Sequence, residues 1–166
     1  MANFHKSKIL NYSAKQIVDL VLDIEKYPQF LPWCKDAKII KIINPNLLNA
    51  YLVVNFKAIS QKYVSRVEFY EEKSPQDINK TYYIIDVKAI EGPFKKLNSR
   101  WRIIDIKDPQ HNIGGSCKVD FYIDFEFSSF VLQKMIGTMF GYASEKMINS
   151  FEERAKKVYN KANLIL

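Results

Sequence analysis

The chain has 166 residues, of which 48% are hydrophobic and 14% aromatic, a composition typical of one globular domain (1–166) with a substantial core. Its net charge of +7 favours contact with nucleic acid, ribosomes or anionic lipid, although the AT-rich codons of its abundant Lys, Ile, Asn, Tyr and Phe are an alternative explanation. No run of 18 uncharged apolar residues occurs and the first six residues contain no apolar stretch, so we expect neither a spanning helix nor a signal peptide.

The first elements are a strand and a helix. Residues 3–11 fit a strand, and Ser13 with Gln16 forms a capping-box pattern at the start of a helix. Apolar residues at helical spacing continue to Ile24, and Tyr27-Pro28 ends the helix because proline disfavours helical geometry at the residue before it. A compact turn between two prolines follows, Tyr27 to Cys34.

Strands fill the middle of the chain. Residues 117–127 alternate strictly between apolar and polar, which indicates one buried and one wet face. Asp120, Asp124 and Glu126 lie on the predicted wet face. The other strand candidates are β-branched or aromatic and are separated by turn sequences: 36–43, 48–58, 62–73, 80–91 and 97–107.

Residues 129–161 have the periodicity of one long helix, about 50 Å in length at ~1.5 Å per residue. This order of elements is not βαβ alternation, and it predicts an α+β fold with helices on one face of an antiparallel sheet. A sheet of six or seven strands that curls around a helix leaves a gap between them. The apolar stripe of the helix comprises Ile136, Phe140, Ala143, Met147, Phe151, Ala155 and Val158.

The sequence contains no catalytic motif that would place a nucleophile beside a base. His5 and His111 read as surface residues, and Cys34 and Cys117 are too far apart in sequence for a zinc motif or a disulfide framework. We therefore expect no enzyme activity, no metal site, and a reduced cytoplasmic environment.

Arginines on two strands leave two interpretations open. Arg66 shares a strand face with Glu68, and Arg100 shares one with Arg102. Either they form ion pairs on the outer face, or one arginine points inward to meet the polar head group of a ligand.

Several segments resemble the coenzyme Q-binding START-like family, which includes the bacterial RatA ribosome-association toxins and a polyketide cyclase-like branch. The most specific is the octapeptide 27–34, Tyr-Pro-Gln-Phe-Leu-Pro-Trp-Cys. Further similarity lies in 63–67, in the Gly-Pro-Phe segment 92–97 followed by Trp101, and in 119–127 with 151–155. The resemblance implies a helix-grip (START-like, SRPBCC superfamily) fold: a seven-stranded curved antiparallel sheet wrapped around a long C-terminal helix.

The resemblance also implies a cavity between the sheet and this helix that binds ubiquinone or a related polyprenyl quinone and so supports respiration. We expect no covalent cofactor and no DNA partner. The partners are a hydrophobic small molecule and, transiently, a membrane surface at the inner face of the cytoplasmic membrane. The expected ligand-binding residues are Tyr27, Phe30, Leu31, Trp33, Phe56, Tyr63, Phe94, Trp101, Phe121, Phe125, Phe127, Phe140 and Met147.

Within that set, Phe121, Phe125, Phe127, Phe140 and Met147 form the expected inner wall. The segment from Tyr27 to Trp33 forms a stiff apolar rim, where the indole N–H of Trp33 would reach a quinone carbonyl or the bilayer. A solid core packed by the same side chains is the alternative structure.

Two other functions remain open. A ribosome-associating regulator would bind the large subunit and block subunit association, using the net charge and the basic residues Lys95, Lys96, Arg100 and Arg102. A cyclase or hydrolase on the same fold would need a buried carboxylate with a strongly shifted pKa inside the cavity.

Overall fold

The computed structural model describes residues 2–56, 58–107 and 115–160. Its strands are β1 (Ala2–Leu10), β2 (Cys34–Asn44), β3 (Leu47–Phe56), β4 (Ile59–Lys73), β5 (Thr81–Glu91), β6 (Phe94–Ile106) and β7 (Ser116–Phe127). Its helices are α1 (Ala14–Leu22), the 3₁₀-helix η1 (Ile24–Gln29), α2 (Phe130–Gly137), α3 (Phe140–Ala155) and the π-helical turn η2 (Lys156–Asn160). No helix among these residues is long and apolar enough to cross a membrane.

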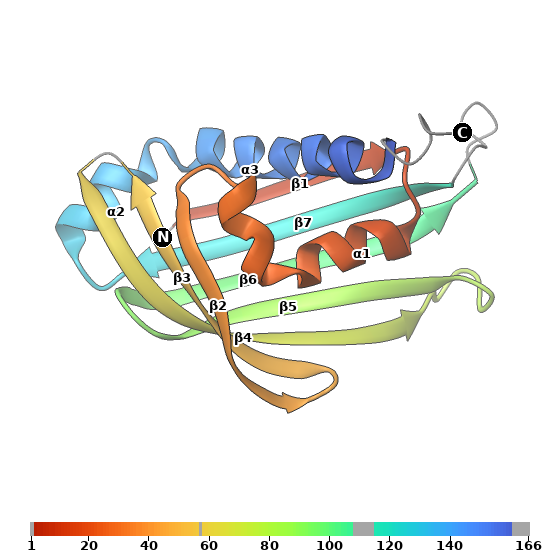
Figure 1. Ribbon diagram of the computed structural model, residues 1–166, viewed down its shortest axis with the longest axis horizontal. Helices are drawn as coiled ribbons and strands as arrows, with labels where there is room; N and C mark the ends of the chain where they lie inside the picture. The colour runs from red at the N-terminus through yellow and green to blue at the C-terminus, as the bar shows by residue number, and fades with distance from the viewer. Residues whose placement is uncertain (1, 57, 108–114, 161–166) are drawn as a thin grey trace.

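The seven strands form one antiparallel sheet in the order β1-β7-β6-β5-β4-β3-β2. Strands β2 to β7 are a meander, and β1 pairs with β7 at the far edge, so α1 and η1 carry the chain from one edge to the other. All helices lie on the concave side, and β2 and β3 rise steeply beside the flatter part of the sheet (Figure 1). The predicted α+β helix-grip fold is confirmed.

β-Bulges contribute to the curvature. The pairing of β2 with β3 shifts register three times, and β4–β5 and β6–β7 each shift once near the same end of the sheet. A bulge bends its strand and increases the local twist. The sheet can therefore wrap around the helices.

Helix α1 begins with the predicted capping box, in which Ser13 and Gln16 exchange backbone-to-side-chain hydrogen bonds of 2.9 and 3.2 Å. Asp105 of β6 accepts a further bond from the amide of Ala14 at 2.7 Å. The prediction that this helix continues to Tyr27-Pro28 is wrong: the non-helical ψ of 62° at Asp23 ends α1, and the chain continues as η1.

The prediction of one unbroken C-terminal helix is also wrong. The helix breaks after Gly137. Glycine disfavours a helix because it loses more backbone entropy on folding than any other residue. After the break, the amide of Met139 donates a hydrogen bond to the carbonyl of Ile136, which closes a tighter turn. Helix α3 alone is about 24 Å long at ~1.5 Å per residue. At its end η2 widens the helical turn, and Val158 of the predicted stripe is 42% exposed; residue 161 lies outside the described residues.

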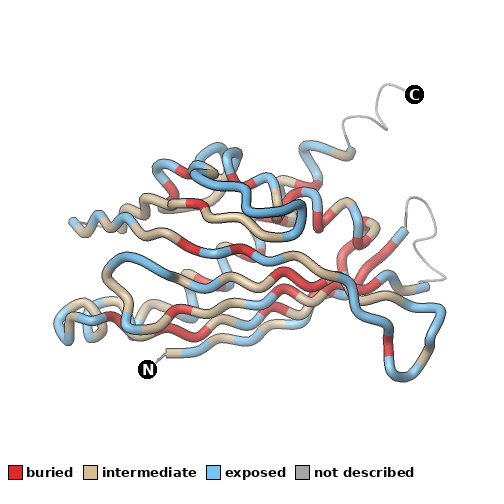
Figure 2. Tube along the Cα trace, turned by 90° about the horizontal axis from the view of Figure 1, so that it is seen from below, coloured by how far each residue is buried: buried red, intermediate tan, exposed pale blue. Residues whose placement is uncertain are grey.

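The core fills the space between the concave face and helices α1 and α3. Buried segments lie toward the interior of both layers, whereas the turns at the two ends of the sheet are mostly exposed (Figure 2). A main cluster surrounds Ile17, Ile85 and Phe121, and a smaller one surrounds Phe125 and Phe127 below α2 and the start of α3. The aromatic residues predicted to face inward on β7 are therefore buried.

One acidic residue of the outer face, Asp124, is buried, although the alternation predicted that it would be exposed to solvent. Asp124 is only 7% exposed and pairs with Lys96 at 2.5 Å, because it lies in β7 between β6 and β1. Asp120 accepts a hydrogen bond from Ser7, and Glu126 pairs with Lys95 at 3.6 Å. These acids hold neighbouring strands together on the outer face.

Candidate ligand-binding cavities

A cavity of about 120 Å³, the first cavity, lies between the sheet and the helices η1, α1 and α3. Three short side chains interrupt the longer ones along its floor: the cross-strand pair Ala50 and Ser65, and Ser99 of β6. Close packing requires long side chains to fill the space between layers, so short ones here leave a hollow. The lining is Val21, Ile24, Tyr27, Leu31, Ala50, Leu52, Tyr63, Ser65, Val67, Ile85, Val87, Leu97, Ser99, Trp101, Phe121, Ile123, Met147 and Phe151.

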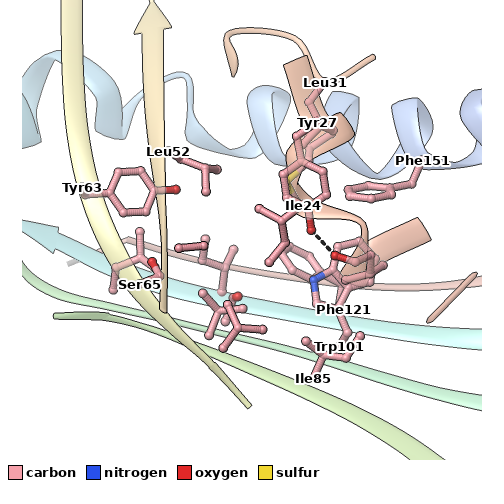
Figure 3. Close-up of a pocket in the computed structure, with 18 residues that line it drawn as sticks. Ile24, Tyr27, Leu31, Leu52, Tyr63, Ser65, Ile85, Trp101, Phe121 and Phe151 are labelled. Atoms are coloured by element: carbon pink, nitrogen blue, oxygen red, sulfur yellow. Dashed lines mark hydrogen bonds between the residues drawn. The ribbon is translucent and has the colours of Figure 1, made fainter. Parts of the chain in front are cut away.

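Aromatic side chains close one end of the first cavity (Figure 3). The ring of Phe151 in α3 contacts Tyr27 and Trp101 edge-on, with centroids 5.6 and 5.0 Å apart. Trp101 in turn packs on Phe121 at 4.6 Å. The hydroxyl of Tyr27 donates a hydrogen bond to the carbonyl of Val21, so this end presents apolar ring surface.

A second cavity of about 150 Å³ adjoins the first near α2 and the start of α3. Tyr63, Leu97 and Ile123 line both cavities and so form their common wall. Each volume is close to that of a cavity that holds a benzene ring. The remaining lining is Val54, Phe56, Ile59, Gln61, Phe94, Phe125, Phe127, Ile136 and Phe140.

Few polar groups reach these cavities. Burial raises the pKa of Tyr27 and of Tyr63 above the ordinary phenol range, because an apolar environment disfavours the phenolate. Both phenols therefore stay neutral at physiological pH. The hydroxyl of Ser65 is buried, and no hydrogen-bond partner for it is found among the described residues.

The structure brings most of the predicted site residues onto the walls. Tyr27, Leu31, Tyr63, Trp101, Phe121 and Met147 line the first cavity, and Phe56, Tyr63, Phe94, Phe125, Phe127 and Phe140 line the second. Their role in binding stays a prediction.

Phe30 and Trp33 lie outside both linings. The ring of Phe30 is held by Phe151 at 5.1 Å and by the guanidinium of Arg154 at 5.2 Å. Trp33 packs against Phe56 at 5.4 Å. The rim segment therefore contributes Tyr27 and Leu31 to the cavity wall, and its other rings brace the wall from behind.

Sequence reasoning missed the serines of the floor and the aliphatic residues of the walls. Ser65 lies on the same face of β4 as Tyr63 and Val67, so period-two alternation within residues 62–73 was a usable signal. The floor residue Ser99 offered a similar signal through Trp101 of β6. Their importance depends on which strands neighbour one another.

None of the three arginines, Arg66, Arg100 and Arg102, points inward. Arg100 forms a bidentate pair with Asp86 at 2.7 and 2.9 Å, Arg102 stacks over the ring of Tyr82 at 3.8 Å, and Arg66 is exposed on the outer face. The interpretation of an inward-facing arginine is wrong for all three, because their strand positions alternate with the residues that line the cavity.

Acid–base chemistry has few candidates here. Among the described residues, the only ionisable side chains in either lining are the tyrosines Tyr27 and Tyr63. The other polar lining residues, Ser65, Ser99 and Gln61, do not ionise. Burial raises the pKa of Cys34 to about 11 and of Cys117 to about 12, which keeps both thiols protonated. His5 is exposed on β1, and His111 lies outside the described residues.

Comparison with known proteins identifies relatives along nearly the whole chain. A "Ribosome association toxin RatA" of Rickettsia prowazekii is 43% identical over 158 residues, covering 95% of this chain and 99% of the relative. A mitochondrial "Coenzyme Q-binding protein COQ10 homolog B" of Xenopus laevis is 25% identical over 166 residues, covering 98% of this chain and 62% of the relative.

A solved structure and a family model agree with these relatives. A START superfamily protein from Mycobacterium smegmatis has the same fold, with a TM-score of 0.71, 22% identity, and coverage of 95% of this chain and 99% of its own. The family model described as polyketide cyclase / dehydrase and lipid transport matches residues 10–152. The chain therefore belongs to the polyketide cyclase / dehydrase and lipid transport family and has the START-like fold.

Proposed function

We propose that this protein binds ubiquinone or a related polyprenyl lipid in the two adjoining cavities and so supports respiratory electron transport. The observation that carries the proposal is the pair of apolar cavities with a common wall of Tyr63, Leu97 and Ile123. The relative named for coenzyme Q binding supports the choice of ligand. A lining without an acid–base pair favours binding over catalysis. We place this binding function in the cytoplasm.

The sizes of the cavities limit what they hold. Burying each CH₂ contributes about 0.8 kcal/mol, so one five-carbon isoprene unit in an apolar cavity contributes roughly 3–4 kcal/mol. Each cavity accommodates about one ring or one isoprene unit. A long prenyl tail must therefore leave the second cavity beside α2.

Titration of delipidated protein with a ubiquinone of two isoprene units tests this proposal. We expect saturable binding, measured as quenching of the fluorescence of Trp101, which lines the first cavity. Ala50→Leu should weaken binding at least tenfold, because its side chain enters the first cavity. Ala58→Leu, the same change at an exposed turn residue, is the matched control and should bind normally; absence of saturable binding to the wild type would contradict the proposal.

A second candidate function is association with the large ribosomal subunit, which blocks subunit joining. The 43% identity to a ribosome association toxin favours it. The four basic residues expected to carry it are largely engaged: Lys95, Lys96 and Arg100 form ion pairs and Arg102 stacks on Tyr82.

The edge strand β2 offers a better-suited basic surface. Lys35, Lys38 and Lys41 are exposed along it, and no ion pair to any of them occurs within the described ranges. Phosphate contacts release counterions, so such a surface binds RNA in a salt-dependent way. We propose this edge as the surface used in the second function.

Co-sedimentation with purified large subunits at 50 and 200 mM salt tests it. The wild type should co-sediment at low salt, and the double variant Lys38→Glu/Lys41→Glu should not. The Ala50→Leu variant separates the two functions, because it should lose quinone binding and keep ribosome association. Failure of the wild type to co-sediment at low salt would refute this function and leave quinone binding standing.

A further inference from the structure

Ser65 is a buried polar residue without an evident structural role. It is 2% exposed, it lines the first cavity, and its Oγ has no hydrogen-bond partner among the described residues. Most buried side-chain polar atoms in proteins are hydrogen-bonded, and an unpaired one destabilises the fold. An unpaired hydroxyl at the wall of a cavity points to a ligand that supplies the partner.

The neighbours of Ser65 leave its hydroxyl open to the cavity. Its cross-strand partners are Ala50 on β3 and Ala89 on β5, whose methyl groups can neither cover it nor bond to it. Figure 3 shows Ser65 and Tyr63 at the end of the cavity opposite Trp101. This end therefore combines two hydroxyl groups with space, whereas the other end is apolar ring surface.

A water molecule is a poorer partner than a ligand at this position. A buried water needs two to four polar partners. The cross-strand neighbours Ala50 and Ala89 offer none, and besides Ser65 the lining supplies only the hydroxyls of Tyr63 and Ser99, because that of Tyr27 is bonded to Val21. One ligand oxygen needs only the single hydrogen bond that Ser65 can donate. The site fits an oxygen carried on an otherwise apolar molecule.

We infer that Ser65 anchors the head group of the bound lipid by donating a hydrogen bond to its carbonyl or hydroxyl oxygen. This inference rests on the proposed lipid-binding function and deepens it by fixing the orientation of the ligand. The oxygenated head lies in the first cavity, and the prenyl tail passes the common wall of Tyr63, Leu97 and Ile123 into the second.

The test compares Ser65→Ala with Ser116→Ala. Ser116 is a matched control because it too is 2% exposed, its Oγ has no hydrogen-bond partner within the part of the chain that the structure describes, and it lies in neither lining. The probes are a ubiquinone of two isoprene units and a hydrocarbon with the same tail and no oxygen. Ser65→Ala should raise the Kd for the quinone about fivefold to tenfold, the size of one lost hydrogen bond, and leave the Kd for the hydrocarbon unchanged.

Infrared spectroscopy of the bound quinone supplies a readout that a purely structural role would not change. A hydrogen bond lowers the stretching frequency of one carbonyl in the wild type and in Ser116→Ala, and Ser65→Ala should abolish that shift. Ser65→Cys, a near-isosteric variant with a weak donor, gives the same comparison if the alanine variant fails to fold.

The outcomes separate the inference from the function on which it rests. Saturable quinone binding by the wild type with an unchanged Kd and carbonyl band in Ser65→Ala would overturn the anchor and leave the lipid-binding function intact. If the wild type binds neither probe, both are overturned. Selective loss of quinone affinity in Ser65→Ala alone would support the anchor.

Discussion

Gly92 holds the turn between β5 and β6 in a conformation that side chains rarely adopt, with φ at +129°. A Cβ atom built there would lie 2.6 Å from the Cβ of Tyr63 and 3.0 Å from its Cα. Tyr63 belongs to the common wall of the two cavities. The glycine therefore lets the Gly-Pro-Phe turn approach the backbone of β4 directly behind that wall.

Gly92→Ala should lower the free energy of unfolding by about 1–3 kcal/mol from backbone strain alone, and by more if Tyr63 must move. Gly141→Ala is the matched control, because a Cβ there meets nothing within 4 Å and the residue is helical. It should raise the free energy of unfolding by about 0.5 kcal/mol. Urea denaturation measures both, and equal effects of the two variants would contradict this account of the turn.

At the scale of elements, the break between α2 and α3 leaves α2 as a separate short helix that covers the smaller core cluster with one side and exposes the other. Helix α2 has no buried residue, and Phe130 and Met135 are 80% and 53% exposed. Ile136 of the same helix lines the second cavity. An apolar surface beside an apolar cavity suits transient contact with a bilayer, so we propose α2, rather than the rim around Trp33, as the element that would make the expected membrane contact.

Phe130→Glu/Met135→Glu should abolish binding to vesicles of phosphatidylcholine with 30% phosphatidylglycerol, because charged side chains do not enter the acyl region. Ile78→Glu is the control. Ile78 is 77% exposed, and it lies on the turn between β4 and β5, distant in sequence from α2. Tm should be unchanged in both variants. Vesicle flotation that is equal for wild type and double variant would exclude α2 as the contact.

At the scale of the whole molecule, the wrapping of the sheet around its helices buries groups that ionise at alkaline pH. The pKa of Cys34 rises from 9.0 to about 11 and that of Cys117 to about 12. In the unfolded chain both thiols lose their protons near pH 9, whereas the folded protein retains them. The folded state then binds more protons than the unfolded state, so stability falls as pH rises.

The free energy of unfolding should therefore be greatest below pH 9 and decline as pH rises through 11 to 12. Burial of Tyr27 and Tyr63 acts in the same direction at higher pH, since it raises the pKa of both phenols. Cys117→Ala should make the decline shallower between pH 9 and 11.5, even if it lowers stability at pH 8. Urea midpoints across this range measure the slope, and an identical slope in Cys117→Ala would disprove the contribution of this thiol.

The sequence by itself determined the seven strands, the start of the first helix and the inward-facing residues of β7. Strict alternation in β7 assigned Phe121, Phe125 and Phe127 to the interior, and the Ser13–Gln16 capping box located the start of α1. These features depend on neighbours within a few residues, which is why local pattern suffices. The strand number and the antiparallel α+β class followed from the order of those elements.

Only the tertiary structure decided where the chain leaves space and where helices break. The floor of Ala50, Ser65 and Ser99 comes from three strands, so the hollow exists only once their register is set. The break after Gly137 lies where the C-terminal segment meets the curved end of the sheet. Burial of Asp124 and exposure of Phe130 likewise depend on which elements lie beside them, and long-range packing overrides local periodicity at all these positions.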